Sequence, residues 1–285
     1  MTDNYIGLEN ELICFDSNER IINYQNVFDR IKKIGHYKIS ENAIRTETGH
    51  GFYVDGSELE ILTPPIALNK GFATRLTDLL MLGREYILKA TPELKYTGYS
   101  IHWNLTKSCV DSDYFYEGLA VPFQVFGLTP LSMGFNLREK ENTYTLKDGQ
   151  SWTIARHEIL GDSINDEDQI RALALLLGAY RFAIETQPDG RTPLKLLDER
   201  FKLRTMSRLF LPDGRYDNVE VHIPSANLKG DMQVQQYLEL FYQWIEPFVK
   251  ILGTNEEVDN LEDFIDGRKR LEFDRFRYFA YVSYC

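Results

Sequence analysis

The sequence predicts an α+β fold: a mostly antiparallel sheet with helices on one face, followed by a helical C-terminal elaboration. Three observations lead to this prediction. Several segments alternate polar and apolar residues in the way that half-buried strands do. Other segments between them have the apolar spacing of amphipathic helices. Roughly the last hundred residues are mostly helical in pattern.

The first part of the chain supplies much of the expected sheet. Strands are expected at residues 5–15 and 95–106, and residues 43–65 have the pattern of two strands or a hairpin. The second of these two strands ends at Pro64-Pro65, because proline has no N–H to donate to a neighbouring strand. Helices are expected at residues 26–34 and 71–90.

The second part of the chain completes the sheet and then changes to helices. Residues 131–146 have the pattern of a hairpin, and residues 151–160 that of a strand. Asn165 is the expected N-cap of a helix that runs to about Glu185, since acidic residues fill its first turn and favour the helix dipole. The other expected elements are helices at residues 113–126, 193–204, 232–252 and 261–281 and an extended stretch at 219–223.

No linker rich in proline, glycine or serine divides the 285 residues. We therefore expect one domain over residues 1–285, with a sheet-based core at 1–190 and a mostly helical part at 191–285. The formal net charge of −11 argues against a general nucleic-acid binder, because phosphate contacts need clustered lysine and arginine. The basic clusters at 200–204 and 268–270 are short and lie among acidic residues.

The sequence also favours a cytoplasmic protein that does not enter a membrane. Its first residues, MTDNY, lack the apolar region of a signal peptide. The longest apolar run, residues 172–180, is too short to span a bilayer. Three widely spaced cysteines fit free thiols in a reducing compartment better than a disulfide framework or a zinc site.

Five of the strand-like segments place polar residues two positions apart. In a strand, such residues point to the same face. If these strands share a sheet, one face gathers carboxylates, an imidazole and guanidiniums, which are groups that hold divalent metals and a polyphosphate. The pairs are Glu9 and Glu11, Glu58 and Glu60, His102 and Asn104, Asn136 and Arg138, and Arg156 and Glu158.

Each pair also has a simpler structural interpretation. The glutamate pairs at 9 and 11 and at 58 and 60 would suit a solvated strand face. Two such strands side by side would repel each other unless a cation lay between them. His102 alone would suit a structural hydrogen bond, and Arg138 and Arg156 would suit salt bridges to neighbouring glutamates as well as phosphate contacts.

Familiar nucleotide and hydrolase motifs are missing from the sequence. It has no GxxxxGK phosphate loop, no GxGxxG after a strand, no HExxH and no GxSxG. If this protein handles ATP, it must therefore do so through metals held on a sheet.

The order of the polar motifs resembles that of a known family. GLENE, ELEILTPP and SIHWN are followed by a strand with Arg156 and Glu158 and then by a helix with an acidic start. Over residues 5–185 this order is similar to the carboxylate–amine ligases of the glutamine synthetase fold, nearest to the glutamate–cysteine ligase type and the amidoligase group. Matched positions are Gly7, Glu9, Glu11, Glu60, Thr63, Pro64, His102, Asn104 and Glu158.

The resemblance implies an ATP-dependent ligase that uses Mg²⁺, or Mn²⁺, and forms an amide or isopeptide bond through an acyl phosphate. It implies metal ligands at Glu9, Glu11, Glu60, His102 and Glu158. It implies nucleotide contacts at Glu9, Asn104, Arg138 and Arg156, with the two arginines as catalytic residues. Two departures are that amidoligases often have a second histidine at the position of Asn104, and that the last motif reads Arg-His-Glu rather than Glu-Phe-Arg.

The expected partner is a small amino acid or a peptide substrate, with no nucleic acid and no membrane, and a homo-oligomer is left open. The aromatic residues of the C-terminal helices suit a core or, alternatively, a peptide groove; they are Trp244, Phe248, Phe273, Phe276, Tyr278 and Phe279. Other functions that fit the motifs are a phosphotransferase on the same fold and a catalytically inactive binding scaffold. A two-metal hydrolase ranks below these, because Asp-rich metal motifs are absent.

Overall fold

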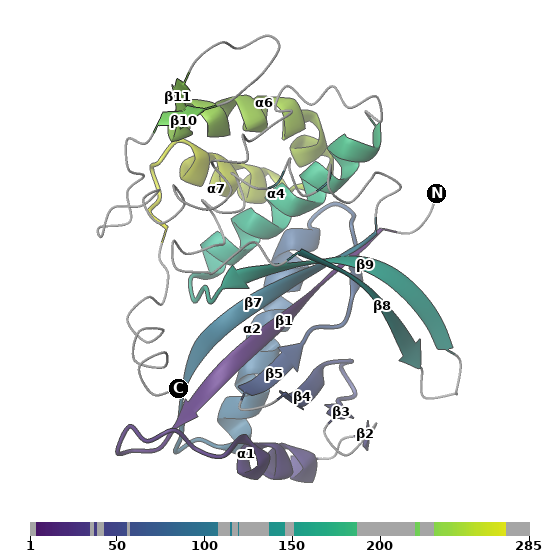
Figure 1. Cartoon of the computed structure of the whole chain (residues 1–285), viewed down its shortest axis with the longest axis vertical. Helices are drawn as coiled ribbons and strands as arrows, with labels where there is room; N and C mark the ends of the chain where they lie inside the picture. The colour runs from purple at the N-terminus through teal and green to yellow at the C-terminus, as the bar shows by residue number, and fades with distance from the viewer. Residues whose placement is uncertain are drawn as a thin grey trace.

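The computed structural model describes residues 4–34, 37–38, 43–55, 58–107, 115, 119, 137–145, 151–186, 220–222 and 231–271 (Figure 1). The expected helix at 193–204 lies outside these residues. The same holds for most of the expected helix at 113–126, the start of the hairpin at 131–146 and the end of the helix at 261–281.

The main element of the fold is a nine-stranded sheet in which all paired neighbours run antiparallel. Eight strands follow the order β2-β3-β4-β5-β1-β7-β9-β8, and β6 pairs with β1. The strands are β1 Tyr5–Phe15, β2 Tyr37–Lys38, β3 Ala43–Arg45, β4 Gly51–Asp55, β5 Glu58–Leu62, β6 Ile66–Ala67, β7 Lys95–Thr106, β8 Leu137–Thr145 and β9 Ser151–Asp162. A separate pair is formed by β10 Glu220–His222 and β11 Asp231–Gln233.

Helices lie against the sheet and at one end of the molecule. Figure 1 shows α2 running behind the central strand β1, and α4, α6 and α7 gathered at the end opposite α1. The helices are α1 Tyr24–Ile31, followed by the 3₁₀ turn η1 Lys32–Ile34, α2 Phe72–Ala90, α4 Glu167–Thr186, α6 Val234–Leu252 and α7 Asn255–Ile265. Within the described residues, none of the helices has the length and apolar character needed to cross a bilayer.

The sheet buries one face against these helices, and this follows from the alternation in its strands. Ile6 and Leu8 of β1 and Trp103 of β7 belong to one buried cluster with α2, α4, α6 and α7. A second cluster packs Phe52 of β4 and Ile61 of β5 against α1. Because successive strand residues face opposite sides, the residues between these apolar ones project from the other face. The predicted α+β fold, with an antiparallel sheet and helices on one face, is confirmed.

Several element boundaries differ from the prediction. Residues 43–62 hold three strands rather than two. Of the hairpin expected at 131–146, the described residues 137–145 form the single strand β8, which pairs with β9. The N-cap of α4 is Asp166 rather than Asn165: Glu167 is the first helical residue, and the Asp166 carboxylate accepts a hydrogen bond of 2.7 Å from the Gln169 N–H. Helix α7 begins at Asn255, six positions before the expected Leu261, because Thr254 and Glu257 form a capping box.

Candidate functional site

The register of the central strands brings the predicted polar residues to one face of the sheet. Glu9 lies opposite His102 in β7, and Glu11 lies opposite Glu60 in β5. Residues directly opposite each other on neighbouring strands share a face. The other directly opposed pairs on this face include Glu11 with Ser100, Gly7 with Asn104, Asn104 with Glu158, Thr106 with Arg156, and Glu158 with Arg138.

A buried ionic cluster forms around Arg156. Its guanidinium donates to Glu9 at 2.6 Å and to Glu158 at 3.3 Å. The Nδ1 atom of His102 lies 3.4 Å from the second oxygen of Glu9 and 4.0 Å from Glu158. All four residues are buried, and Glu158 has no exposed surface. Arg156 and Glu158 therefore point to the same face as Glu9, although their order in the sequence departs from the family pattern.

The charges of the cluster determine how its groups are protonated. Burial by itself raises the pKa of Glu9, but the close contact with His102 and the charge and hydrogen bond of Arg156 outweigh it, and the pKa falls to about 2. Burial lowers the pKa of His102, but its close contact with Glu9 and the negative charges of the glutamates around it raise the pKa above its ordinary value. The site thus holds an ionised carboxylate in spite of its burial.

Three of the five predicted metal ligands come close enough to share one ion. One ligand atom each of Glu9, His102 and Glu158 lies within 4.8 Å of the other two. Mg²⁺ prefers oxygen ligands and binds an imidazole nitrogen less readily, whereas Mn²⁺ accepts carboxylate oxygens and an imidazole nitrogen together. The donor set therefore fits a divalent cation.

Glu11 and Glu60 lie beside this group rather than in it. The Glu11 carboxylate is 3.5 Å from Nε2 of His102, the ring nitrogen that faces away from Glu9. Ser100 donates to Glu11 and lies 3.1 Å from the same nitrogen. Glu60 is placed across from Glu11 by the register. These residues extend the polar face from the ionic cluster toward β5.

For Arg138 the structure gives only the position in the strand, and for Asn136 it gives none. Arg138 stands opposite Glu158 in β8, so the register puts it on the same face, while its side chain lies outside the described atoms. Asn136 lies outside the described residues. Glu58, two residues before Glu60, is on the shared face by alternation.

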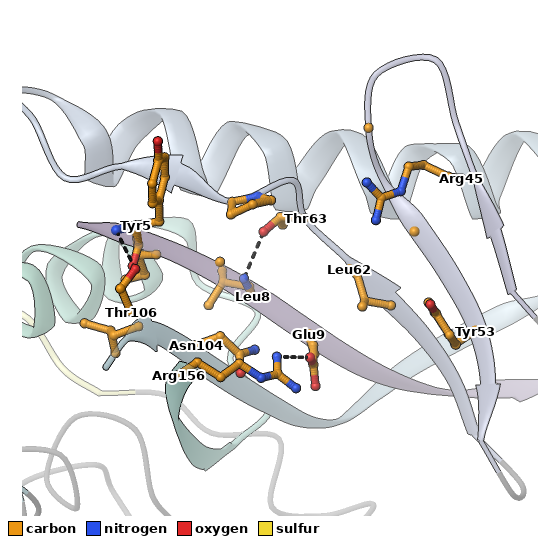
Figure 2. Close-up of a pocket in the computed structure, with 16 residues that line it drawn as sticks. Tyr5, Leu8, Glu9, Arg45, Tyr53, Leu62, Thr63, Asn104, Thr106 and Arg156 are labelled. Atoms are coloured by element: carbon orange, nitrogen blue, oxygen red, sulfur yellow. Dashed lines mark hydrogen bonds and ion pairs between the residues drawn. The ribbon is translucent and has the colours of Figure 1, made fainter. Parts of the chain in front are cut away.

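A pocket opens beside the ionic cluster, toward the start of β1 (Figure 2). Glu9, Asn104 and Arg156 form one side of it, and Arg45 and Tyr53 the other. Gly7, which has no side chain, contributes to the lining between Tyr5 and Glu9 and so leaves space there. The remaining lining residues are Tyr5, Ile6, Leu8, Gly49, Gly51, Leu62, Thr63, Pro65, Leu105 and Thr106.

Three residues of this face were missed by the sequence analysis. Ser100 precedes His102 by two positions, so extending the same alternation would have found it. Tyr53 lies opposite Glu60 and could have been found in the same way from the strand GFYVD. Arg45 lies in β3, which has only three residues, and so short a strand gives no alternation to detect.

On the opposite face of the sheet, hydrogen bonds of Asn10 and Arg84 hold the backbone around Glu11. The side chain of Asn10 donates to the carbonyl of Ser100 at 2.9 Å and to that of Glu11 at 3.3 Å. The partly buried Arg84 of α2 donates to Asn10 at 3.0 Å and to the carbonyl of Ile164 at 3.0 Å. Burial lowers the pKa of Arg84 to about 10. These bonds lie next to a β-bulge between Glu11 and Leu12 and fix the backbone that carries Glu11.

Comparison with known proteins gives structural matches only. No protein-family model and no curated protein matches the chain. Among solved structures, the complex of the prokaryotic ubiquitin-like protein Pup with its ligase PafA matches at a TM-score of 0.59 and 15% identity, covering 94% of this chain and 63% of that one. The Pup ligase PafA in complex with ADP matches at a TM-score of 0.51 and 16% identity, covering 81% of this chain and 60% of that one.

The chain thus spans less than two thirds of the length of these ligases. At this level of identity the likeness establishes the fold. The chain has the α+β fold that is seen in the Pup ligase PafA.

Proposed function

We propose that this chain is an ATP- and Mg²⁺-dependent carboxylate–amine ligase. The observation that carries the proposal is the buried cluster of Glu9, His102, Glu158 and Arg156 on the face of the sheet opposite the helices. The fold is that of PafA, whose structure has been solved with ADP, and this supports the use of a nucleotide.

The proposed reaction has two steps. In the first, an oxygen of the substrate carboxylate attacks the γ-phosphorus of ATP, the bond from that phosphorus to the β–γ bridging oxygen breaks, and ADP leaves. In the second, the nitrogen of an amine attacks the carbonyl carbon of the acyl phosphate. The bond from this carbon to the phosphate oxygen breaks, inorganic phosphate leaves, and the nitrogen loses a proton to give an amide or isopeptide bond.

The chain's own residues would bind and orient the reacting groups. Glu9, His102 and Glu158 are the proposed ligands of a divalent ion, with Glu11 and Glu60 available beside them. When bound, this ion would neutralise charge on the phosphates. Arg156 is held by two carboxylates, so its planar fork is fixed in direction, and we propose that it and Arg138 contact phosphate oxygens.

The proposed carboxylate and amine substrates are classes of compound rather than single compounds. In the complex with PafA the bound partner is the small protein Pup, which supports a peptide or protein substrate beside the small amino acid implied by the sequence resemblance. We propose that the pocket beside the ionic cluster receives this carboxylate.

One observation favours a second candidate, an inactive binding scaffold. Arg156 pairs with both Glu9 and Glu158, so the site contains a cation that neutralises two carboxylates without a metal. A ligase requires that a divalent ion compete successfully with this guanidinium, whereas a scaffold requires only the ion pairs.

Calorimetry with Mn²⁺ and with Mg²⁺·ADP separates the two candidates. We expect the wild-type chain to bind both, and Glu9→Gln to weaken Mn²⁺ binding at least tenfold, because one anionic ligand is lost. Glu85→Gln, an exposed carboxylate on α2, is the matched control and should bind as wild type does. A wild-type chain that binds neither Mn²⁺ nor the nucleotide would favour the scaffold.

A further inference from the structure

Among the buried polar atoms that line the pocket beside the ionic cluster, one on each side has hydrogen-bonding capacity that is not used within the described part of the chain. One is a donor, Nε of Arg45, and the other is an acceptor, Oδ1 of Asn104. Leaving such groups without a partner costs free energy, because each has lost its water. They line opposite sides of the same pocket, which indicates a ligand that satisfies both (Figure 2).

Arg45 differs from Arg156 in its electrostatic surroundings. Arg156 has Glu9 and Glu158 as counter-ions. Arg45 forms no ion pair with any residue that the structure describes, although it is partly buried. Its guanidinium is therefore a positive charge that a ligand anion can neutralise.

The register places Arg45 on the same face of the sheet as Glu9. Arg45 lies opposite Gly51, Gly51 opposite Leu62, and Leu62 opposite Glu9. These four residues form one row on the same face, and Gly51 next to Arg45 contributes no side chain. With strands about 4.8 Å apart, the backbones of Arg45 and Glu9 are roughly 14 Å apart, so a ligand can lie between the two side chains.

Asn104 supplies the complementary group at the other side. It is buried, with 9% of its surface exposed, and it lies opposite both Gly7 and Glu158. Its unused oxygen accepts hydrogen bonds, so it favours an N–H or O–H donor on the ligand.

We propose that this pocket binds a ligand oxyanion, a carboxylate or a phosphate, through Arg45, and a donor group of the same ligand through Asn104. The inference rests on the proposed function and makes it more specific. The oxyanion belongs either to the substrate acid or to the nucleotide. Arg45 is then a binding residue of the ligase, placed three strands away from Glu9, the nearest of the three clustered metal ligands proposed.

The test compares full-length wild type with Arg45→Met and with Arg45→Lys, which keeps the charge. The control is Arg30→Met, which removes an exposed arginine of α1 that pairs with Glu93 far from the pocket. ADP, inorganic phosphate and L-glutamate are titrated calorimetrically, each with Mg²⁺. We expect at least one probe to bind wild type. Its affinity should fall tenfold to a hundredfold in Arg45→Met, fall less in Arg45→Lys and stay unchanged in Arg30→Met.

Thermal unfolding without any probe excludes a merely structural role. An unneutralised cation destabilises the free protein, so Arg45→Met should melt at the same temperature as wild type or higher. If Arg45→Met binds ADP and phosphate more weakly than wild type does, the nucleotide is the source of the oxyanion. If it binds only L-glutamate more weakly, the substrate acid is the source. The proposal is overturned if no probe binds wild type, if Arg45→Met binds every probe as wild type does, or if it melts much lower.

These outcomes are separable from those of the proposed function. If a probe depends on Arg45 but ATP is never turned over, the ligase assignment fails and the oxyanion pocket stands. If ATP is turned over with an acid and an amine while Arg45→Met binds and reacts unchanged, the pocket inference alone fails.

Discussion

Glu9 is a buried side chain whose charge is retained because its partners are arranged around it. Arg156 and His102 each contact one of its oxygens, at 2.6 and 3.4 Å. An isolated carboxylate at this depth would become neutral. The same contacts that keep Glu9 ionised also present it as a candidate metal ligand, so at this position stability and proposed chemistry depend on one set of interactions.

Glu9→Gln should therefore destabilise the metal-free protein. Removing one partner of a buried ion pair leaves the other charge insufficiently compensated, which typically costs about 3 kcal/mol. Urea unfolding of the metal-free chain measures this change. Glu85→Gln is the comparison, since it removes only an exposed carboxylate of α2 and should leave stability nearly unchanged. Equal stability for Glu9→Gln and wild type would show that the Arg156 pair contributes nothing.

His50 gives a pH dependence of stability that is independent of the site. It is fully buried, Nε2 lies 2.7 Å from the carbonyl of Leu79, and Nδ1 lies 2.8 Å from the hydroxyl of Thr48. The neutral ring with a proton on Nε2 satisfies both contacts. Burial lowers the pKa of His50 below its ordinary value of 6.5, so the unfolded chain takes up the proton first.

The contribution of His50 to stability should be full above pH 6.5 and should be lost as the pH falls below it. Thermal midpoints of wild type and His50→Gln measured between pH 7.5 and 5 test this, because the difference between the two curves isolates this residue. The difference should shrink toward acidic pH. A constant difference would contradict a buried neutral histidine.

At the scale of elements, Glu257 joins the starts of two helices. One oxygen accepts from the N–H and hydroxyl of Thr74 at the start of α2, at 2.6 and 2.7 Å. The other accepts from the N–H of Thr254 at 2.8 Å and completes the capping box of α7. A carboxylate here also complements two helix dipoles. This residue fastens the C-terminal helices to the sheet-based part.

Glu257→Gln keeps the shape of the side chain but removes its charge, and it should cost about 1–2 kcal/mol. Glu256→Gln, in the same turn but exposed, should change little. Chemical denaturation gives the free energies, and amide hydrogen exchange should show faster exchange at the starts of both α2 and α7. Faster exchange at α7 alone would mean that the Thr74 contacts do not couple the helices.

Long elements were predictable from the sequence, and short or capped ones were not. The bounds of β1 and β7 match the prediction residue for residue, because eleven and twelve residues of alternation outweigh local exceptions such as Asn10. The third strand within residues 43–62 was missed because β3 has three residues. The start of α7 had a usable signal, Thr254 followed by Glu257, which hydrophobic periodicity alone does not weigh.

The candidate site followed from alternation, and its limits followed from strand order. Same-face pairing gave Glu9, Glu11, His102 and Glu158, but only the register shows which carboxylates reach one ion. Arg45 comes from a strand three places from β1 in the sheet, and no local pattern places it. Sequence reasoning therefore finds the residues of a site more readily than the distances between them.

At the scale of the molecule, the C-terminal helices are part of the same core as the sheet. Tyr180 of α4 packs against Phe241 and Trp244 of α6, with ring centroids 5.8 and 5.9 Å apart. Trp244 and Phe248 are partly buried against the large hydrophobic cluster, which favours the core interpretation for these two aromatics. The four aromatics at 273–279 lie outside the described residues. The sheet face that carries the site stays on the side opposite this packing.

The most direct measurement of the central claim is a hydroxylamine trap. The full chain is incubated with ATP, Mg²⁺, a pool of amino acids and short peptides bearing carboxylates, and hydroxylamine, which replaces the amine. A carboxylate–amine ligase should give ADP, phosphate and a hydroxamate, in amounts that match one another, and Glu9→Gln should give none. A stable phosphorylated product that accumulates without any amine and resists hydroxylamine would contradict the ligase and indicate a phosphotransferase.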